Sequence, residues 1–109
     1  MHELAIAESV VSSVLERTGE RPVSSVRLRV GRLAGVVPDA LRFSFELATA
    51  GTPLAGASLE IVEEPGRAHC RTCSVDFDLA DPFLLCSCGS ADVELLSGRE
   101  LTVASVQVA

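Results

Sequence analysis

Cys70-Arg71-Thr72-Cys73 and Cys86-Ser87-Cys88 are the stretches that decide how this chain of 109 residues is organised. They contain all four of its cysteines. Four thiols in so short a segment are typical of one tetrahedral metal site. Zn²⁺ is the expected ion, because it is soft enough for thiolate and imposes no geometry of its own. A closed shell of four thiolates leaves no open position for a substrate, so we expect a structural site.

Other readings of the cysteines fit the sequence less well. Two disulfides need an oxidising compartment. The first residues lack the basic segment and the long apolar run of a signal peptide, so we expect a cytoplasmic protein. A thioredoxin-like pair needs a helix start after a strand, whereas Pro65-Gly66 and Asp81-Pro82 frame a loop here. An iron–sulfur cluster stays open as an alternative, although the paired spacing suits zinc better.

Composition limits the classes of partner. The chain carries a net charge of −6, and Asp76, Asp78 and Asp81 outnumber Arg67 and Arg71 around the cysteines. Because phosphate would be repelled, we expect no nucleic acid as partner. No apolar run approaches the length of a bilayer span, so we expect no membrane insertion. The core must come from Leu, Val, Ile and Ala, since Trp and Tyr are absent and there are four Phe.

Helical periodicity is visible in two segments on the N-terminal side of the cysteines. Residues 2–18 place apolar side chains on one stripe, with Glu3 at the start and Arg17 at the end, as the helix dipole favours. Gly19 then follows as a stop signal. A second helix is expected from Pro38, with Asp39 in its first turn, and Gly51-Thr52-Pro53 ends it. The apolar stripes are Leu4, Ala7, Val10, Val11, Val14 and Leu15 in the first helix, and Leu41, Phe45 and Ala48 in the second.

Strand patterns flank these helices and the cysteine segment. Residues 26–30 alternate cleanly between apolar and charged side chains, and residues 59–63, 92–96 and 101–108 also read as strands. We therefore predict an α+β fold, in which a small mixed sheet of about three strands carries two helices on one face. A zinc-ribbon-like loop domain interrupts it. Residues 1–64 and 97–109 would form the α/β domain, and residues 65–96 the insert. The apolar residues of the insert are too few to fold it alone, and metal ligation can contribute on the order of 10 kcal/mol or more.

The N-terminus offers a second metal site. The α-amine of Met1, the amide nitrogen of His2 and its imidazole Nδ1 can converge on one ion in small chelate rings. Three nitrogens in a plane suit square-planar Ni²⁺ or Cu²⁺. Glu3 could add an oxygen, with Asp39 as a further candidate. From these residues alone, an exposed terminal residue is the better-supported interpretation of His2, because chain termini are commonly disordered.

Several short motifs, taken in order, resemble the HypA/HybF family of nickel metallochaperones, which act in the maturation of [NiFe]-hydrogenase and urease. The resemblance covers the whole chain, and each motif alone is weak. The motifs are Met1-His2-Glu3-Leu4, Val30-Gly31-Arg32-Leu33, Ala40-Leu41-Arg42-Phe43, Gly51-Thr52, the Cys-x-x-Cys segment, Cys88-Gly89-Ser90 and Ser97-Gly98-Arg99-Glu100-Leu101.

The resemblance implies a carrier without catalytic activity. Ni(II) would be transient cargo at Met1, His2 and Glu3, and Zn(II) would be structural at the four cysteines. The implied partners are the hydrogenase maturation GTPase and the hydrogenase large subunit, and we expect a monomer or weak homodimer. The chain departs from the family at Cys86-Ser87-Cys88, where a second Cys-x-x-Cys is usual. The shorter knuckle should bring fewer backbone N–H groups to the thiolates.

The remaining function classes have less support in the sequence. No Ser/His/Asp set is present, because His2 is terminal and His69 adjoins Cys70. No phosphate-binding Gly-x-x-x-x-Gly-Lys motif occurs, so GTP hydrolysis would belong to a partner. His69 is expected to be a solvated neighbour of the zinc site, with zinc ligation as the alternative. A zinc-ribbon module for protein interaction or nucleic-acid binding, and a redox thiol protein, are the alternatives from other classes.

Overall fold

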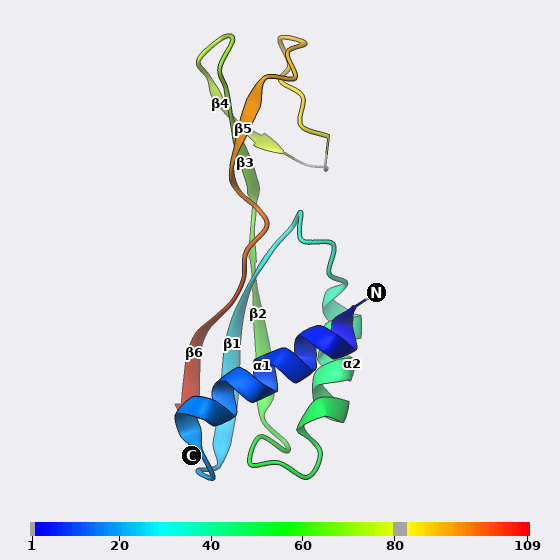
Figure 1. The fold of residues 1–109 in the computed structure, drawn as a ribbon, viewed down its shortest axis with the longest axis vertical. Coiled ribbons are helices and arrows are strands. Elements are labelled where there is room, and N and C mark those ends of the chain that lie inside the picture. Colours follow the sequence, from blue (N-terminus) through cyan, green and yellow to red (C-terminus); the bar gives the residue numbers. More distant parts are fainter. Residues whose placement is uncertain (1, 80–82) are drawn as a thin grey trace.

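The computed structural model describes residues 2–79 and 83–109, so Met1 and the Asp81-Pro82 turn signal lie outside the described residues. The molecule is elongated, with extents of 52 × 23 × 17 Å. Two helices and one sheet form its larger end, and a second small sheet forms the other end (Figure 1). The predicted α+β class is thus confirmed. None of the helices in the described ranges is long and apolar enough to cross a membrane.

Both predicted helices are present, close to their expected bounds. Helix α1 spans Glu3–Thr18 and ends at Gly19, whose φ is +60°, as the stop signal predicts. Helix α2 spans Pro38–Thr49 and begins with proline at its first position. Each helix buries most of the stripe that its periodicity predicts, with Leu15 and Ala48 partly buried, whereas Leu4 is exposed. The buried apolar residues are Ala7, Val10, Val11 and Val14 in α1, and Leu41 and Phe45 in α2.

The larger sheet is mixed and has three strands in the order β2-β1-β6. Strand β1 (Val23–Gly31) lies in the centre, parallel to β2 (Ser58–Glu64) and antiparallel to β6 (Leu101–Val108). Helix α2 belongs to the crossover that makes β1 and β2 parallel. The strand count and the mixed character agree with the sequence prediction.

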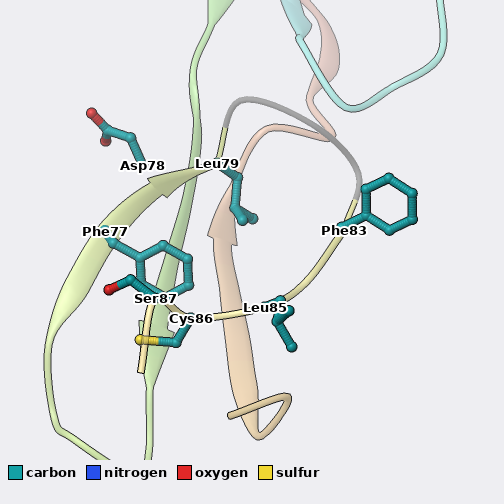
Figure 2. A pocket seen from close by; sticks show the side chains of 7 residues that line it. All are labelled: Phe77, Asp78, Leu79, Phe83, Leu85, Cys86 and Ser87. Atoms are coloured by element: carbon teal, nitrogen blue, oxygen red, sulfur yellow. The ribbon is translucent and has the colours of Figure 1, made fainter. Parts of the chain in front are cut away.

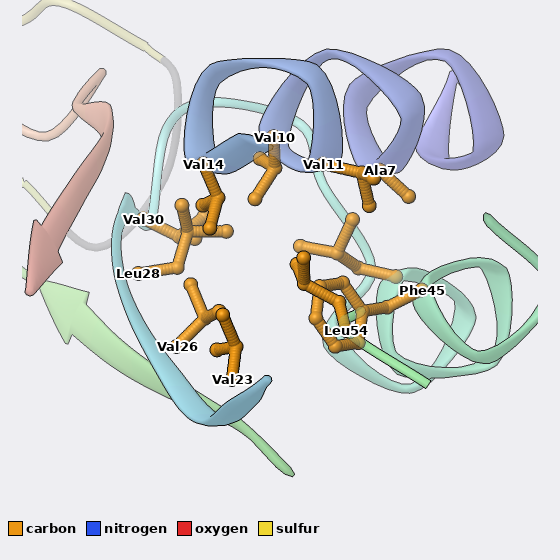
Figure 3. Close-up of a cluster of buried hydrophobic side chains, with 11 residues drawn as sticks. Ala7, Val10, Val11, Val14, Val23, Val26, Leu28, Val30, Phe45 and Leu54 are labelled. Carbon is orange, nitrogen blue, oxygen red and sulfur yellow. The ribbon is translucent and has the colours of Figure 1, made fainter. Parts of the chain in front are cut away.

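One face of this sheet is buried against the helices, and the other face is exposed to solvent. Val26, Leu28 and Val30 are buried beneath the helices (Figure 3). Arg27 and Arg29, which alternate with them along β1, are exposed on the opposite face. Arg27 pairs with Glu60 at 3.1 Å, and Arg29 pairs with Glu64 at 3.0 Å. Because the alternation has a period of two, it fixes which face of β1 turns to the core. The core cluster is Ala7, Val10, Val11, Val14, Val23, Val26, Leu28, Val30, Leu41, Phe45 and Leu54.

The smaller sheet contains structure that the sequence did not predict. Its strands are β3 (Gly66–Cys70), β4 (Asp76–Leu79) and β5 (Val93–Ser97), in the order β4-β3-β5 with both pairings antiparallel. We expected a strand over 92–96, and β5 confirms it within one residue at each end. The ranges of β3 and β4 were expected to be loop. They form a short hairpin that places Cys70 and Cys73 at its turn.

A narrow neck joins the two sheets. The backbone N–H of Gly31 donates to Glu100 O at 2.7 Å, and that of Leu33 donates to Gly98 O at 2.7 Å. A Cβ atom on Gly31 would lie 2.0 Å from Gly98 O, so only glycine allows this approach. The side chain of Leu33 packs against the backbone positions of Gly66 and Gly98. The segment after β1 therefore touches both connections between the sheets before it continues into α2.

Candidate metal centres

The four cysteines predicted to bind zinc lie together at the far end of the small sheet. Their Sγ atoms all lie within 4.8 Å of one another. Sγ of Cys70 is 3.7 Å from Sγ of Cys88, and Sγ of Cys73 is 3.7 Å from Sγ of Cys86. A regular tetrahedron with Zn–S bonds of about 2.3 Å has edges of about 3.8 Å. The donor set therefore fits a single tetrahedral ion, and the separations exceed the disulfide bond length of about 2.05 Å.

Two tight turns hold these sulfur atoms in place. After β3, the N–H of Ser74 donates to Cys70 O at 2.8 Å, and Ser74 itself has a φ of +59°. In the second turn, the N–H of Gly89 donates to Cys86 O at 2.9 Å, and Gly89 has a φ of +92°. A residue in the left-handed region lets each turn reverse within one knuckle.

Backbone N–H groups reach sulfur atoms in both turns. In the first, Cys73 and Thr72 donate to the sulfur of Cys70, and Val75 donates to that of Cys73. In the second, Ser90 donates to the sulfur of Cys88. Charge-assisted bonds of this kind stabilise thiolate ligands. The first knuckle thus brings N–H donors to both of its sulfurs.

The thiols have different acidities without a metal. The N–H of Cys73 lies 3.5 Å from the Cys70 sulfur, and this contact is the main reason that the pKa of Cys70 is lowered to about 6. Hydrogen bonds with the thiols of Cys70 and Cys86 raise the pKa of Cys73 to about 12. The N–H of Ser90 lowers the pKa of Cys88, but the contact with the Cys86 thiol, burial and the contact with the Cys70 thiol outweigh this and raise the pKa overall. A bound cation must therefore displace several protons, so metal binding weakens as the pH falls.

An apolar groove of about 510 Å³ borders the cluster at Cys86. Figure 2 shows Phe77 and Leu79 of β4 on one side of this groove, with Leu85 and Phe83 on the facing segment. Cys70 and Cys86 are buried, whereas Cys73 and Cys88 are exposed at the surface. Among the described residues, the groove reaches the cysteine cluster only at Cys86.

The imidazole of His69 forms a hydrogen bond with the carboxylate of Asp76. Its Nδ1 lies 2.5 Å from Asp76 Oδ1 across the β3–β4 pair. The four ligand atoms that converge are all cysteine sulfurs, and His69 is not one of them. Within the described ranges, His69 is therefore a neighbour of the cysteine site, and its contact with Asp76 links β3 to β4.

Of the predicted nickel residues, His2 and Glu3 lie at the start of α1 in the larger half, next to the first turn of α2. Met1 lies outside the described residues. His2 precedes the first turn of α1 and is exposed, its carbonyl oxygen accepts the N–H of Ile6 at 2.9 Å, and its imidazole forms no capping bond to the helix. Its ring nitrogens are therefore available to a metal ion.

Glu3 is more deeply buried than the sequence suggested, with 5% of its surface exposed. Its Oε2 accepts the backbone N–H of Val37 at 3.1 Å, and Val37 is the residue directly before α2. The carboxylate therefore sits at the N-terminal ends of two helices, where both dipoles favour a negative charge. This long-range contact carries no signal in the sequence.

Asp39 lies two residues beyond Val37, in the first turn of α2. Its side chain is 96% exposed, and its Oδ1 accepts a hydrogen bond from Arg42 at 3.2 Å. The contact between Glu3 and Val37 brings this turn close to the start of α1. The further candidate for an oxygen ligand is thus near the start of α1, but its carboxylate is paired with the guanidinium of Arg42.

Comparison with known proteins identifies the family of this chain. A family model described as "Hydrogenase/urease nickel incorporation, metallochaperone, hypA" matches residues 1–108. The chain belongs to the HypA family. The hydrogenase maturation factor HypA of Streptomyces avermitilis is 51% identical over 112 aligned residues, covering 97% of this chain and 86% of that protein. The one of Nostoc punctiforme is 41% identical over 108 residues, covering 99% and 96%.

Solved structures share the fold. The solution structure of the Ni metallochaperone HypA from Helicobacter pylori superposes with a TM-score of 0.68 at 20% identity, covering 99% of this chain and 97% of that one. A second solution structure, of a HypA protein, gives a TM-score of 0.62 at 18% identity over 97% and 92%. The resemblance drawn from the short motifs is thereby confirmed for the family and the fold.

Proposed function

We propose that this chain is a nickel carrier, which binds Ni(II) at its N-terminus and delivers it during the maturation of [NiFe]-hydrogenase or urease. The observation that carries this proposal is the match of residues 1–108 to a family of nickel-incorporation metallochaperones. Nickel is the cargo in this proposal, so the site needs moderate affinity and ready release. It does not need a closed coordination shell.

The N-terminal residues supply suitable donors. The Met1 amine, the His2 amide nitrogen and the His2 Nδ1 would bind Ni(II) in one plane. Exposure of His2 supports this, since the imidazole needs no rearrangement of the helix to reach an ion. Cu²⁺ would bind the same nitrogens more tightly, so metal supply must contribute to selectivity.

Release is helped by the position of the site at a helix N-terminus. The dipole of α1 opposes a cation there, and the adjacent start of α2 adds to this. Deprotonation of the His2 amide and the carboxylate of Glu3 would offset the opposition. Glu3 acts in this proposal mainly by charge, because its Oε2 is engaged by the N–H of Val37.

The four cysteines would hold Zn(II) as a structural ion. Cys70, Cys73, Cys86 and Cys88 fit by spacing and by donor type, and all four positions of a tetrahedron would be filled. Zinc would supply folding free energy to the small sheet. The small sheet and its loops bury little apolar surface of their own, since Val75, Phe83 and Leu85 are all more than half exposed. Metal ligation would therefore contribute to the stability of this part of the chain.

Partners and location follow from the same proposal. The chain would act in the cytoplasm without catalysing a reaction, with the maturation GTPase supplying nucleotide hydrolysis and the hydrogenase large subunit receiving nickel. A nucleic-acid-binding module is disfavoured by the net charge of −6.

The test is a nickel titration of the zinc-loaded protein with its native N-terminus, alongside two histidine variants. His2→Ala should lose most of its nickel affinity. His69→Ala is the matched control, because it removes the other imidazole of the chain, which lies in β3 of the small sheet. If His69→Ala loses as much affinity as His2→Ala, or if neither variant loses any, the proposed N-terminal site is wrong.

A further inference from the structure

Two hydroxyl groups meet between the turns that carry the cysteines. Thr72 lies in the first turn, between Cys70 and Cys73, and Ser90 lies in the second turn, just before β5. The Oγ1 atom of Thr72 is 2.8 Å from the Oγ atom of Ser90. Both turns lie at the far end of the small sheet (Figure 1). This hydroxyl bridge therefore links one cysteine turn to the other through side chains that are not themselves metal ligands.

Each residue of the bridge also donates its backbone N–H to a cysteine sulfur. The N–H of Thr72 donates to the sulfur of Cys70, and the N–H of Ser90 donates to the sulfur of Cys88. These two sulfurs come from different turns and lie 3.7 Å apart. The hydroxyl bridge therefore joins the two residues whose N–H groups serve one pair of facing sulfurs.

Ser90 is held in place by its own turn. Its Oγ accepts the N–H of Asp92 at 3.1 Å, and its carbonyl oxygen accepts the N–H of Cys86 at 3.0 Å. A hydroxyl can accept one hydrogen bond while it donates or accepts another. Thr72 therefore contacts a hydroxyl whose position is already set by the second turn.

The residue before Thr72 connects to the same segment. The backbone N–H of Arg71 donates to Asp92 O at 3.0 Å, and its guanidinium lies 3.0 Å from the Asp92 carboxylate and 3.8 Å from that of Glu94. These ion pairs are exposed, so they contribute little on their own. The backbone contact aligns the two turns, so the two hydroxyls need little further ordering to meet.

We propose that Thr72 and Ser90 are positioning residues of the zinc site, whose hydroxyl bridge holds the N–H donors against the sulfurs of Cys70 and Cys88. This role rests on the structural zinc proposed above. Groups that hydrogen-bond around metal ligands typically change metal affinity by about 10–100-fold when they are removed. Because this bridge is exposed, water replaces part of the lost contact, and the effect should be smaller.

The rate at which a chelator removes zinc from the full-length protein measures this role. Thr72→Val keeps the branched shape but removes the hydroxyl, and it should speed zinc loss about three- to tenfold. Thr72→Ser keeps the hydroxyl and should lose zinc at close to the wild-type rate. Ser87→Ala is the matched control, because it removes an exposed hydroxyl of the second knuckle that takes no part in the bridge.

A double-mutant cycle separates the bridge from other effects of each residue. Ser90→Ala should lose zinc faster than Thr72→Val, because it also leaves the N–H of Asp92 without this acceptor. If the two hydroxyls act through each other, adding Thr72→Val to Ser90→Ala should change the rate by less than about twofold. Rate increases that multiply in the double variant would show that the hydroxyls act independently, and would overturn the bridge.

Alkylation gives a second readout, which a general loosening of the turns would not reproduce. Cys73 and Cys88 are both exposed, one in each turn. With zinc bound, Thr72→Val should raise the initial alkylation rate of Cys88 more than that of Cys73, although Thr72 adjoins Cys73 in the sequence. The reason is that the bridge supports the N–H donor to Cys88. Equal rates of increase, or a larger increase at Cys73, would contradict the proposal.

The outcomes distinguish this proposal from the zinc site itself. Every variant should begin with about one zinc ion per chain, since all four sulfurs remain. If the wild-type protein carries no zinc, the four-cysteine site is wrong and the bridge has no metal to serve. If the wild type carries zinc but Thr72→Val loses it no faster than Ser87→Ala, the bridge is overturned while the zinc site stands.

Discussion

Removal of the Glu3 carboxylate should destabilise the helical half of the protein. In Glu3→Ala, the N–H of Val37 loses an acceptor at 3.1 Å, and a charge buried to within 5% of its surface disappears from two helix N-termini. A hydrogen bond to a charged group contributes about 1.5–3 kcal/mol. Each helix terminus adds about 0.3–1 kcal/mol. Because water can reach the N–H of Val37 again in the variant, we expect a loss of about 2 kcal/mol.

Urea unfolding followed by helical circular dichroism, with zinc present, measures this loss. A decrease of about 2 kcal/mol corresponds to roughly 10 °C in the midpoint of thermal unfolding for a domain of this size. Glu3→Gln keeps an acceptor oxygen but no charge, so about half of the effect should remain. Glu8→Ala, an exposed glutamate on the same helix, should stay within about 0.5 kcal/mol of the wild type. If Glu3→Ala is no less stable than Glu8→Ala, the role assigned to the buried carboxylate is refuted.

Other regions of the molecule give three further expectations. Cys73→Ala should lower the zinc content and unfold the small sheet, while the helical signal largely persists; full zinc content in this variant would contradict a four-cysteine site. Insertion of one residue between Cys86 and Cys88 should slow zinc loss to a chelator by adding N–H donors to the second knuckle, and unchanged or faster loss would show that the short knuckle is equally good. Gly31→Ala should lower the free energy of unfolding by about 3 kcal/mol or more, because the added Cβ would lie 2.0 Å from the backbone oxygen of Gly98. Gly35→Ala should lower it by about 1–2 kcal/mol, because Gly35 has a φ of +75° but no atom within 4 Å of the added Cβ. Equal unfolding free energies for these two glycine variants would contradict the close packing in the neck.

The larger half of the fold could be predicted because its pattern is local. The apolar stripe from Ala7 to Val14 repeats with the helical period, and the alternation from Val26 to Val30 repeats with the strand period. Each pattern determines both the element and the face that it buries. The four cysteines likewise indicated one cluster, because so few residues separate them.

Strands β3 and β4 could not be predicted in the same way. Together they are short, contain Cys70, His69 and two aspartates, and show little apolar alternation. Their pairing depends on contacts with each other and with β5, which the local sequence does not encode. A hairpin beside a metal cluster obtains its order from ligation as well as from propensity.

The contact of Glu3 with Val37 could not be predicted from the sequence either. The two residues lie on different elements, and their approach follows from the packing of α1 against α2. The sequence indicated only that a carboxylate suits the start of α1. The structure adds that the same carboxylate serves α2, which limits its use as a nickel ligand to what Val37 leaves accessible.

The most direct test of the nickel-carrier account is calorimetric titration of Ni²⁺ into two forms of the zinc-loaded protein. One form has the native N-terminus, and the other has Gly-Ser added before Met1. The extension leaves every side chain in place but converts the α-amine of Met1 into an amide and displaces it from the chelate. The account predicts a strong loss of nickel affinity in the extended form, with zinc content and helical signal unchanged. Equal affinity in the two forms would contradict it and would place the nickel site elsewhere in the chain.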